Sequence, residues 1–292
     1  MNDYENAIEI KGLTKKYDGF TLDNIGFRVP NGSIMGFIGQ NGAGKTTTIK
    51  ALLNIIKCDA GSIKIFGKDN IKDELEIKSQ LAVVFDEIPF HDDFNARQLS
   101  VIMQDIYSEW SNDTFISYLG RFALPEKKKI GQFSKGMKMK LQIAAALSHN
   151  AKLLVMDEAT TGLDPVVRNE ILEIFLEYLQ DESHSILMSS HITSDLEKIA
   201  DSITFIDKGK ILISGYKDDI LKNHGIIKCS KSDYKSIEPQ DIISARLTDF
   251  GAEVMINDKS SCKRKYSGLV LDNATLDDIM VYYVNRGKKE WA

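Results

Sequence analysis

The segment from Gly39 to Thr46 reads Gly-Gln-Asn-Gly-Ala-Gly-Lys-Thr and fits the phosphate-binding pattern G-x-x-x-x-G-K-[ST]. Glycines in such a loop let successive backbone N–H groups turn inward around an anion, and a helix that begins there adds the positive end of its dipole. We expect Lys45 to reach the β- and γ-phosphates of a nucleoside triphosphate and the Thr46 hydroxyl to bind Mg²⁺. The alternative is a glycine-rich turn that only caps a helix.

An acid pair, Asp157-Glu158, follows the apolar segment 153–156. An acid at the end of a strand beside a phosphate loop is where Mg²⁺ needs a second protein ligand, and a neighbouring acid suits the polarisation of an attacking water. On its own, a strand that ends in two solvated acids is an equally good interpretation. Further polar segments lie before a helix or after a strand, namely Ser134-Lys135-Gly136, Gly162-Leu163-Asp164 and Ser189-Ser190-His191.

The elements around these motifs follow an α/β pattern. Residues 7–16 and 20–29 alternate like two antiparallel strands joined by a turn at Asp18-Gly19. Buried strands are predicted at 33–38, 152–156, 185–189 and 202–207, and further extended segments at 62–66 and 81–85. Helices are predicted from Thr47, at 73–80, 95–107, 112–122 and 134–149, and after Pro165. The sequence therefore predicts a nucleotide-binding core with a helical insertion over about residues 87–150.

The sequence changes character after His224. Strands are predicted at 226–229, 253–256 and 269–271, and a closing amphipathic helix at 274–285. A basic cluster, Lys263-Arg264-Lys265, lies in the polar segment between them. We expect residues 1–224 to form the nucleotide-binding domain and residues 225–292 a small accessory α/β domain.

The composition excludes several classes of protein. The formal net charge of −5 gives no reason to expect a nucleic-acid partner. The cysteines at 58, 229 and 262 lack metal-type spacing and indicate a reducing compartment. The N-terminal segment is acidic and does not resemble a signal peptide, and no run of 18 apolar residues occurs. We therefore expect that the chain does not span a membrane by itself.

In their order and spacing these motifs resemble the ATP-binding cassette (ABC) ATPase family, and the resemblance covers about residues 7–224. The resemblance rests on the phosphate loop, the helical insertion, a Ser-x-Gly signature, the acid pair, the Gly-Leu-Asp turn and a histidine after a strand. It implies a P-loop NTPase core with an antiparallel β subdomain and a helical subdomain, to which the C-terminal α/β extension is added. It also implies ATP and Mg²⁺ as ligands and ATP hydrolysis as the activity.

The resemblance implies a role for each matching position. Glu158 matches the general base, and His191 matches the histidine that touches the γ-phosphate. Asp157 matches the acid associated with Mg²⁺, and Tyr17 matches the aromatic residue that stacks on adenine. Residues of the phosphate loop match those around the phosphates, namely Gly39, Asn41, Gly42, Ala43, Gly44, Lys45, Thr46 and Thr47. Residues that reach the site of an opposite subunit or cross the dimer interface are Ser134, Gly136 and Asp164.

The sequence departs from the family's pattern at two places. Asp86 stands where the family usually has a Gln that contacts Mg²⁺ and signals to the membrane partner. An acid here can approach Mg²⁺ directly or through water, but it is shorter and adds a charge. In the signature, Lys135 and Met137 replace a glycine and a glutamine, and Lys135 puts a positive charge near the expected triphosphate. Together with the run at 127–129, these lysines are also typical of a solvated basic face.

The family's mechanism implies two cassettes, as a homodimer or with a sister subunit, that close head to tail around two ATP molecules. A separate permease would hold the chain at the cytoplasmic side of the membrane, with its coupling helix near residues 86–100. The chain looks most like subunits of bacterial ABC-2-type exporters in the bacitracin-resistance and peptide-exporter branch, which implies antimicrobial or amphipathic peptides, or drugs, as cargo. The alternatives are a soluble ABC ATPase that remodels ribosomes or DNA, and a nucleotide sensor without turnover.

Overall fold

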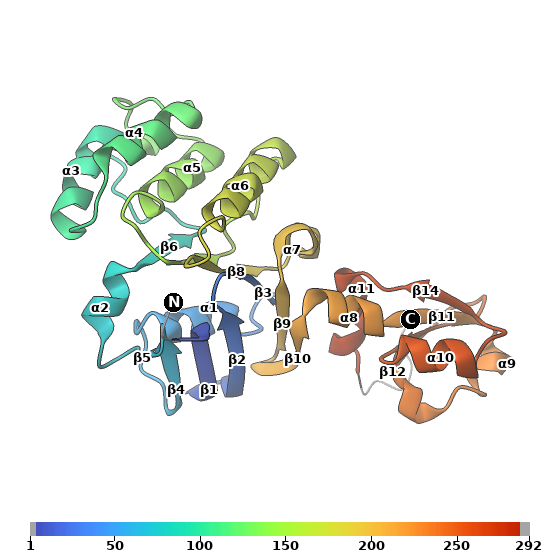
Figure 1. Cartoon of the computed structure of the whole chain (residues 1–292). Coiled ribbons are helices and arrows are strands. Elements are labelled where there is room, and N and C mark those ends of the chain that lie inside the picture. Colours follow the sequence, from blue (N-terminus) through green and yellow to red (C-terminus); the bar gives the residue numbers. More distant parts are fainter. Residues whose placement is uncertain (1–3, 287–292) are drawn as a thin grey trace.

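The structure is a computed structural model that describes residues 4–286. Its first sheet has the order β2-β1-β4-β5, with β1 (Asn6–Tyr17) and β2 (Phe20–Pro30) paired antiparallel. The turn between them places Tyr17 opposite Phe20, as the sequence predicts. The sheet is completed by β4 (Ala60–Ile65) and β5 (Lys68–Asp69), and in Figure 1 it lies beneath α1.

The second sheet positions the chemistry. Its six strands have the order β10-β9-β3-β8-β7-β6. All neighbouring pairs are parallel except β9 with β10. The strands are β3 (Ile34–Ile38), β6 (Leu81–Phe85), β7 (Leu153–Asp157), β8 (Ser185–Ser190), β9 (Ser202–Asp207) and β10 (Lys210–Tyr216).

Strand register brings the predicted motifs to one edge of this sheet. Ile38 pairs with Ser190, and Asp157 pairs with Ser189, so β3, β7 and β8 end together. Every residue of these three strands is buried, which explains why the centre of each strand is apolar. The phosphate loop, the acid pair and His191 all follow these carboxyl ends, where ligands of open α/β sheets bind.

Helices cover both faces of the second sheet. On one side, α1 (Lys45–Leu52) follows the phosphate loop, and α2 (Glu74–Ser79) precedes β6. On the other side, α3 (Ala96–Ile106), α4 (Asn112–Arg121) and α5 (Lys135–Ala146) form the helical insertion beside α6 (Pro165–Tyr178) (Figure 1). Side chains at the preceding residue accept a hydrogen bond from the first turn of α3 to α6, which fixes where these helices begin. The helices predicted at 95–107, 112–122 and 134–149 are therefore present.

The C-terminal residues form a third sheet of order β12-β13-β11-β14, with antiparallel pairs throughout. Three strands were predicted, and β12 (Ile242–Leu247) is the additional one. The basic cluster 263–265, in a polar segment for which no element is predicted, lies on the short helix α10 (Lys259–Lys265). The other elements are α7 (Thr193–Ile199), α8 (Lys217–Asn223), β11 (Gly225–Cys229), α9 (Lys231–Tyr234), β13 (Ala252–Ile256), β14 (Val270–Asn273) and α11 (Leu276–Val284).

Helix α11 joins this sheet to the rest of the chain. The Leu276 N–H donates to Glu197 on α7 at 2.6 Å, and the Tyr283 hydroxyl lies 2.9 Å from Nε2 of His224. Leu276 and Ile279 are fully buried in the same apolar core as Leu196 of α7. The third sheet is thus packed against the second through α7, α8 and α11 (Figure 1). Within residues 4–286, no helix has the length and apolar character needed to cross a membrane.

Candidate nucleotide-binding and hydrolysis site

The phosphate loop connects β3 to α1 in a conformation that requires glycine. Gly44, directly before α1, has φ of +117°, a value that L side chains rarely adopt. A Cβ on Gly39 would lie 2.5 Å from the Ile206 carbonyl oxygen, so the loop packs directly on β9. The Ala43 carbonyl accepts a hydrogen bond of 2.9 Å from the Gly209 N–H in the turn between β9 and β10. Close packing of backbone on backbone therefore fixes the loop, while Asn41 and Gly42 remain exposed.

Lys45 lies at the centre of the loop. Its side chain is 5% exposed, and its ammonium donates to the carbonyls of Gly39 at 2.6 Å and Gln40 at 3.3 Å. The same ammonium lies 2.9 Å from Oε1 of Glu158. The structure thus brings the cation of the phosphate loop to the second acid of the pair.

Glu158 is the most densely connected side chain of the site. Its Oε2 accepts a hydrogen bond of 2.8 Å from the Thr161 hydroxyl and lies 2.7 Å from Nδ1 of His191. Burial disfavours the charged carboxylate, but Lys45, Thr161 and His191 together outweigh burial and hold the pKa of Glu158 below its usual range. A carboxylate can only accept, so Nδ1 of His191 carries the proton in this contact. Glu158 is therefore ionised near neutral pH, as a general base must be.

Asp157 is held from the neighbouring strand. The Ser189 hydroxyl donates to Oδ1 of Asp157 at 2.5 Å, and Ser189 also accepts from the Glu158 N–H at 3.2 Å. The Asp157 carboxyl is 6% exposed, whereas Thr46 is exposed at the start of α1. Among the residues that the structure describes, no group of three or more His, Cys, Asp or Glu side chains could hold a metal. Two oxygen donors beside a phosphate site fit Mg²⁺, which binds through few protein ligands together with phosphate oxygens and water.

Ser189, Thr161 and Arg168 contact the site, although the sequence motifs assign no role to them. Ser189 and Thr161 orient the two acids, and their only sequence signal is their place within the motifs that contain His191 and Glu158. Arg168 of α6 donates to the Leu163 carbonyl at 3.1 Å, and its Nε lies 3.8 Å from the buried Asp195 of α7. Arg168 thereby connects the Gly-Leu-Asp turn to the helix that follows His191.

Tyr17 is on the first sheet, at the end of β1. Its ring is 45% exposed, and the Lys15 ammonium lies 5.4 Å from the ring centre. An exposed aromatic face beside a cation suits stacking on a nucleobase, whereas a residue that serves only the core would be buried.

The signature residues lie apart from the phosphate loop. Ser134 and Gly136 begin α5, in the helical group on the opposite side of the second sheet from α1 (Figure 1). The Ser134 hydroxyl is exposed and accepts from the Met137 N–H at 3.3 Å. Asp164 is also exposed and accepts from the N–H groups of Val166 and Val167. Each residue caps a helix, and each leaves polar groups on the surface.

The two departures from the family pattern contact each other. The Lys135 ammonium lies 2.6 Å from Oδ1 of Asp86, and both side chains are nearly half exposed. The lysines at 127–129 are exposed, and Lys129 pairs with Asp93 at 2.8 Å, which fits the solvated face. A role of Asp86 at Mg²⁺ remains a prediction.

Comparison with known proteins agrees with this geometry. Residues 22–161 match the family described as ABC transporter. The chain is 36% identical to the bacitracin transport ATP-binding protein BcrA of Bacillus licheniformis, over 70% of this chain and 68% of that protein. It is 34% identical to the lantibiotic transport ATP-binding protein SrtF of Streptococcus pyogenes, over 70% of this chain and 89% of that protein.

Solved structures are similar as well. A structure described as the ATP binding subunit of an ABC transporter superposes with a TM-score of 0.67 at 27% identity, over 73% of this chain and 91% of that chain. The ADP conformation of the ATP-binding cassette MJ1267 gives a TM-score of 0.64 at 20% identity, over 74% of this chain and 93% of that chain, which supports the fold. Sequence, site geometry and fold together show that this chain belongs to the ABC transporter family, as one of its ATP-binding and ATP-hydrolysing subunits.

Proposed function

We propose that this chain is the ATPase subunit of a bacterial exporter and that it closes as a dimer around two ATP molecules to drive a separate permease. The observation that carries the proposal is the convergence of Lys45, Glu158 and His191 at the carboxyl ends of three adjacent strands. In this arrangement the proposed general base directly contacts both the phosphate-binding cation and a hydrogen-bonding imidazole. A nucleotide sensor without turnover would not need an ionised base in this position.

Each side chain has a defined task in this proposal. Lys45 and the loop N–H groups bind the β- and γ-phosphates, and the ionised Glu158 accepts a proton from the attacking water. His191, whose Nδ1–H is held by Glu158, presents Nε2 toward the γ-phosphate. Mg²⁺, held through Thr46 and Asp157, would neutralise phosphate charge. Tyr17 stacks on adenine.

The dimer is proposed because the signature is exposed and distant from its own phosphate loop. In a head-to-tail pair, Ser134 and Gly136 complete the site of the opposite subunit, and Asp164 lies at the interface. The opposite subunit is a second copy or a sister chain. We propose residues 1–224 as the nucleotide-binding domain and residues 225–292 as an accessory domain.

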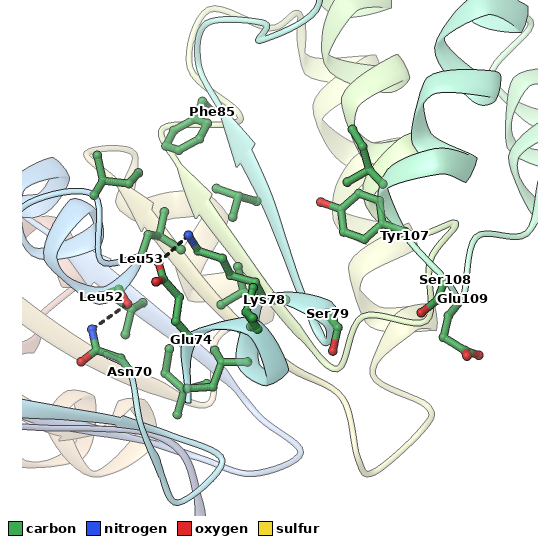
Figure 2. Close-up of a pocket in the computed structure, with 17 residues that line it drawn as sticks. Leu52, Leu53, Asn70, Glu74, Lys78, Ser79, Phe85, Tyr107, Ser108 and Glu109 are labelled. Carbon is green, nitrogen blue, oxygen red and sulfur yellow. Dashed lines mark hydrogen bonds and ion pairs between the residues drawn. The ribbon is translucent and has the colours of Figure 1, made fainter. Parts of the chain in front are cut away.

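An apolar pocket of about 440 Å³ is the proposed docking site for the permease (Figure 2). It lies between α2 and the end of α3, with Phe85 and Tyr107 on its walls. Exposed apolar side chains surround it, since Leu75 is 87% exposed and Ile106 is 62% exposed. The Glu74–Lys78 ion pair of 2.6 Å also lines the pocket and is its main charged feature in Figure 2.

We assign the pocket to a permease helix because of its chemistry and its position. Exposed apolar patches of this kind on soluble proteins mark interaction surfaces. The pocket includes Phe85, directly before the segment 86–100 where the coupling helix is predicted to dock, and residues 106–109 at the end of the helix that continues from that segment. Strand β6 lines the pocket and leads directly to Asp86. In this proposal, movement of the docked helix is therefore transmitted through β6 to the ATP site. Docking here places the chain at the cytoplasmic side of the membrane.

The cargo is proposed to be an antimicrobial or amphipathic peptide, or a drug. Relatives with 28–36% identity are named for bacitracin, lantibiotic and daunorubicin/doxorubicin resistance or transport. The test is to purify the chain with its membrane partner and to measure ATP turnover with candidate compounds. Co-purification of a hydrophobic permease and stimulation by one compound class are expected. Co-purification with ribosomes or DNA instead would contradict the proposal and support a soluble remodelling ATPase.

The docking site is tested separately by Leu75→Glu, which places a charge at the edge of the pocket. Because Leu75 is 87% exposed, this change is expected to leave folding and ATP binding of the isolated chain intact while releasing the permease. The control is Val270→Glu, which places the same charge at an exposed apolar position on β14. Equal permease binding by wild type and Leu75→Glu would exclude this pocket as the docking site.

A further inference from the structure

We propose that Asp86 and Lys135 form an intramolecular latch that must open when the dimer closes, with Lys135 passing from Asp86 to the triphosphate of the opposite subunit. The proposal rests on the dimer proposed above and adds a regulation of its closure. Asp86 would be a positioning residue and Lys135 the residue that contacts ATP.

The contact joins the end of a strand of the second sheet to the helical insertion. Asp86 directly follows β6, Lys135 is the first residue of α5, and their charged groups lie 2.6 Å apart. The side chains are 45% and 47% exposed, so the pair can exchange with an arriving anion. The Lys135 ammonium also lies beside Gly162, where a Cβ would be 3.4 Å away. Lys135 is thus at the junction of the loop after β6, the signature and the turn before Asp164.

Because Lys135 is the first residue of α5, its positive charge needs a nearby anion for compensation. The first turn of a helix carries the positive end of the dipole, where a cation is unfavourable. The first turn of α5 contains no acidic residue, so Asp86 supplies the compensating charge from outside the helix. A triphosphate brought to Ser134 and Gly136 would offer more negative charge to the same ammonium. Asp86 and the triphosphate therefore compete for Lys135.

The two departures from the family pattern have one explanation in this contact. Lys135 without Asp86 would leave a cation unpaired at the start of α5, and Asp86 without Lys135 would leave an anion unpaired near the phosphates. Both together give a neutral pair in the open subunit. On closure Asp86 is left near the bound Mg²⁺ and phosphates, so the latch favours the open state until ATP is bound.

Neighbouring ion pairs keep the surrounding segment in place. Lys138 of α5 lies 3.1 Å from Asp92, and Lys129 lies 2.8 Å from Asp93. The first pair connects the segment after β6 to α5, and the second connects the same segment to the residues that precede α5. Both pairs lie farther from the start of the signature than the Asp86–Lys135 pair does. Opening the latch can therefore redirect the Lys135 head group without loosening the segment.

The test uses the full chain with Glu158→Gln, which is expected to hold ATP without hydrolysis. The ATP concentration for half-maximal dimer formation is measured by sedimentation, and ATP binding to the monomer is measured with a fluorescent nucleotide analogue. Asp86→Asn keeps the shape but removes the charge. It is expected to lower the ATP concentration needed for the dimer by about two- to fivefold, the range of exposed ion pairs, beyond any change measured in monomer binding. Lys135→Met is expected to raise that concentration.

The double variant decides whether the two residues act on each other. With Lys135→Met already present, Asp86→Asn is expected to have no further effect, because the latch is absent. The first control is Asp92→Asn, which removes an equivalent ion pair one turn farther along α5. The second is Glu87→Gln, because Glu87 is exposed and forms no ion pair within residues 4–286. Both controls are expected to leave dimer formation unchanged.

Different results overturn different proposals. If Glu158→Gln binds ATP and forms no dimer, the dimer is wrong and the latch is wrong with it. If the dimer forms but Asp86→Asn does not change the ATP concentration needed for it, the latch alone is wrong. The latch alone is also wrong if Asp86→Asn changes that concentration equally in the presence and absence of Lys135→Met. An effect of Glu87→Gln equal to that of Asp86→Asn would also overturn it, because a general change of charge would then suffice.

Discussion

The Lys45 ammonium and the Glu158 carboxylate lie 2.9 Å apart, at the ends of two strands that are not neighbours in the sheet. Strand β8 lies between them, and its Ser189 contacts one acid while His191, directly after the strand, contacts the other. The proposed phosphate-binding cation and the proposed base are therefore connected within a single network of side chains. The contact also helps to keep Glu158 ionised.

Ser189→Ala is expected to lower ATP turnover about tenfold and to leave ATP binding nearly unchanged. The hydroxyl is fully buried and donates to Asp157, while it accepts from the Glu158 backbone, so both acids lose a positioning contact. Each lost hydrogen bond is also expected to cost about 1 kcal/mol of unfolding free energy. Turnover, nucleotide affinity and thermal unfolding are measured on the same preparation.

Ser185→Ala is the matched control for Ser189. Ser185 is buried at the other end of β8, and its hydroxyl accepts from the Gly32 N–H at 3.0 Å, away from the acids. A similar loss of stability with normal turnover is expected. If both variants lose turnover to the same extent, Ser189 has only a structural role.

The pH dependence of turnover should respond to Thr161. Protonation of Glu158 removes the base, so turnover falls as the pH drops through the Glu158 pKa, and the stabilisation from its contacts is lost over the same range. Thr161→Val removes one of the contacts that lower this pKa, so the pKa rises. The acid limb of the turnover profile is expected to move to higher pH.

Thr160→Val provides the comparison for this shift. Thr160 is fully buried, and in the part of the chain that the structure describes its hydroxyl has no hydrogen-bond partner. Valine has nearly the same shape, so this variant should keep the wild-type pH profile. An unchanged acid limb in Thr161→Val would show that the threonine does not set the Glu158 pKa.

Tyr17→Ala is expected to raise the KM for ATP by about tenfold, since stacking on a base contributes about 1–3 kcal/mol. The ring is 45% exposed, so folding should change little. Tyr17→Phe retains the ring and should retain the KM. If KM is equally low in wild type, Tyr17→Ala and Tyr17→Phe, adenine binds elsewhere.

Much of the core could be predicted because local signals and tertiary structure agree there. Fully buried parallel strands give continuous apolar segments, as at 153–156, and the glycines from Gly39 to Gly44 are required by close packing and positive φ. Their positions after strand ends also place Lys45, Glu158 and His191 together. The family, the α/β fold and the ATPase activity were thereby predicted correctly.

The contacts between distant residues could not be predicted. β12 was missed because its pattern is short and interrupted by Ser244 and Arg246. The helix over 259–265 was missed because its charges resemble a solvated loop. The pairing of Asp86 with Lys135 depends on how α5 packs beside β6, which no local pattern in either segment specifies.

Glu158 is proposed as the general base of an ATP site that a second subunit completes. The most direct measurement is ATP turnover of Glu158→Gln together with ATP binding and sedimentation. Glutamine keeps the size of the side chain but cannot accept the proton, so turnover is expected to fall by at least about 100-fold. ATP should still bind and should convert the monomer into a stable dimer. Undiminished turnover in this variant would show that Glu158 is not the general base.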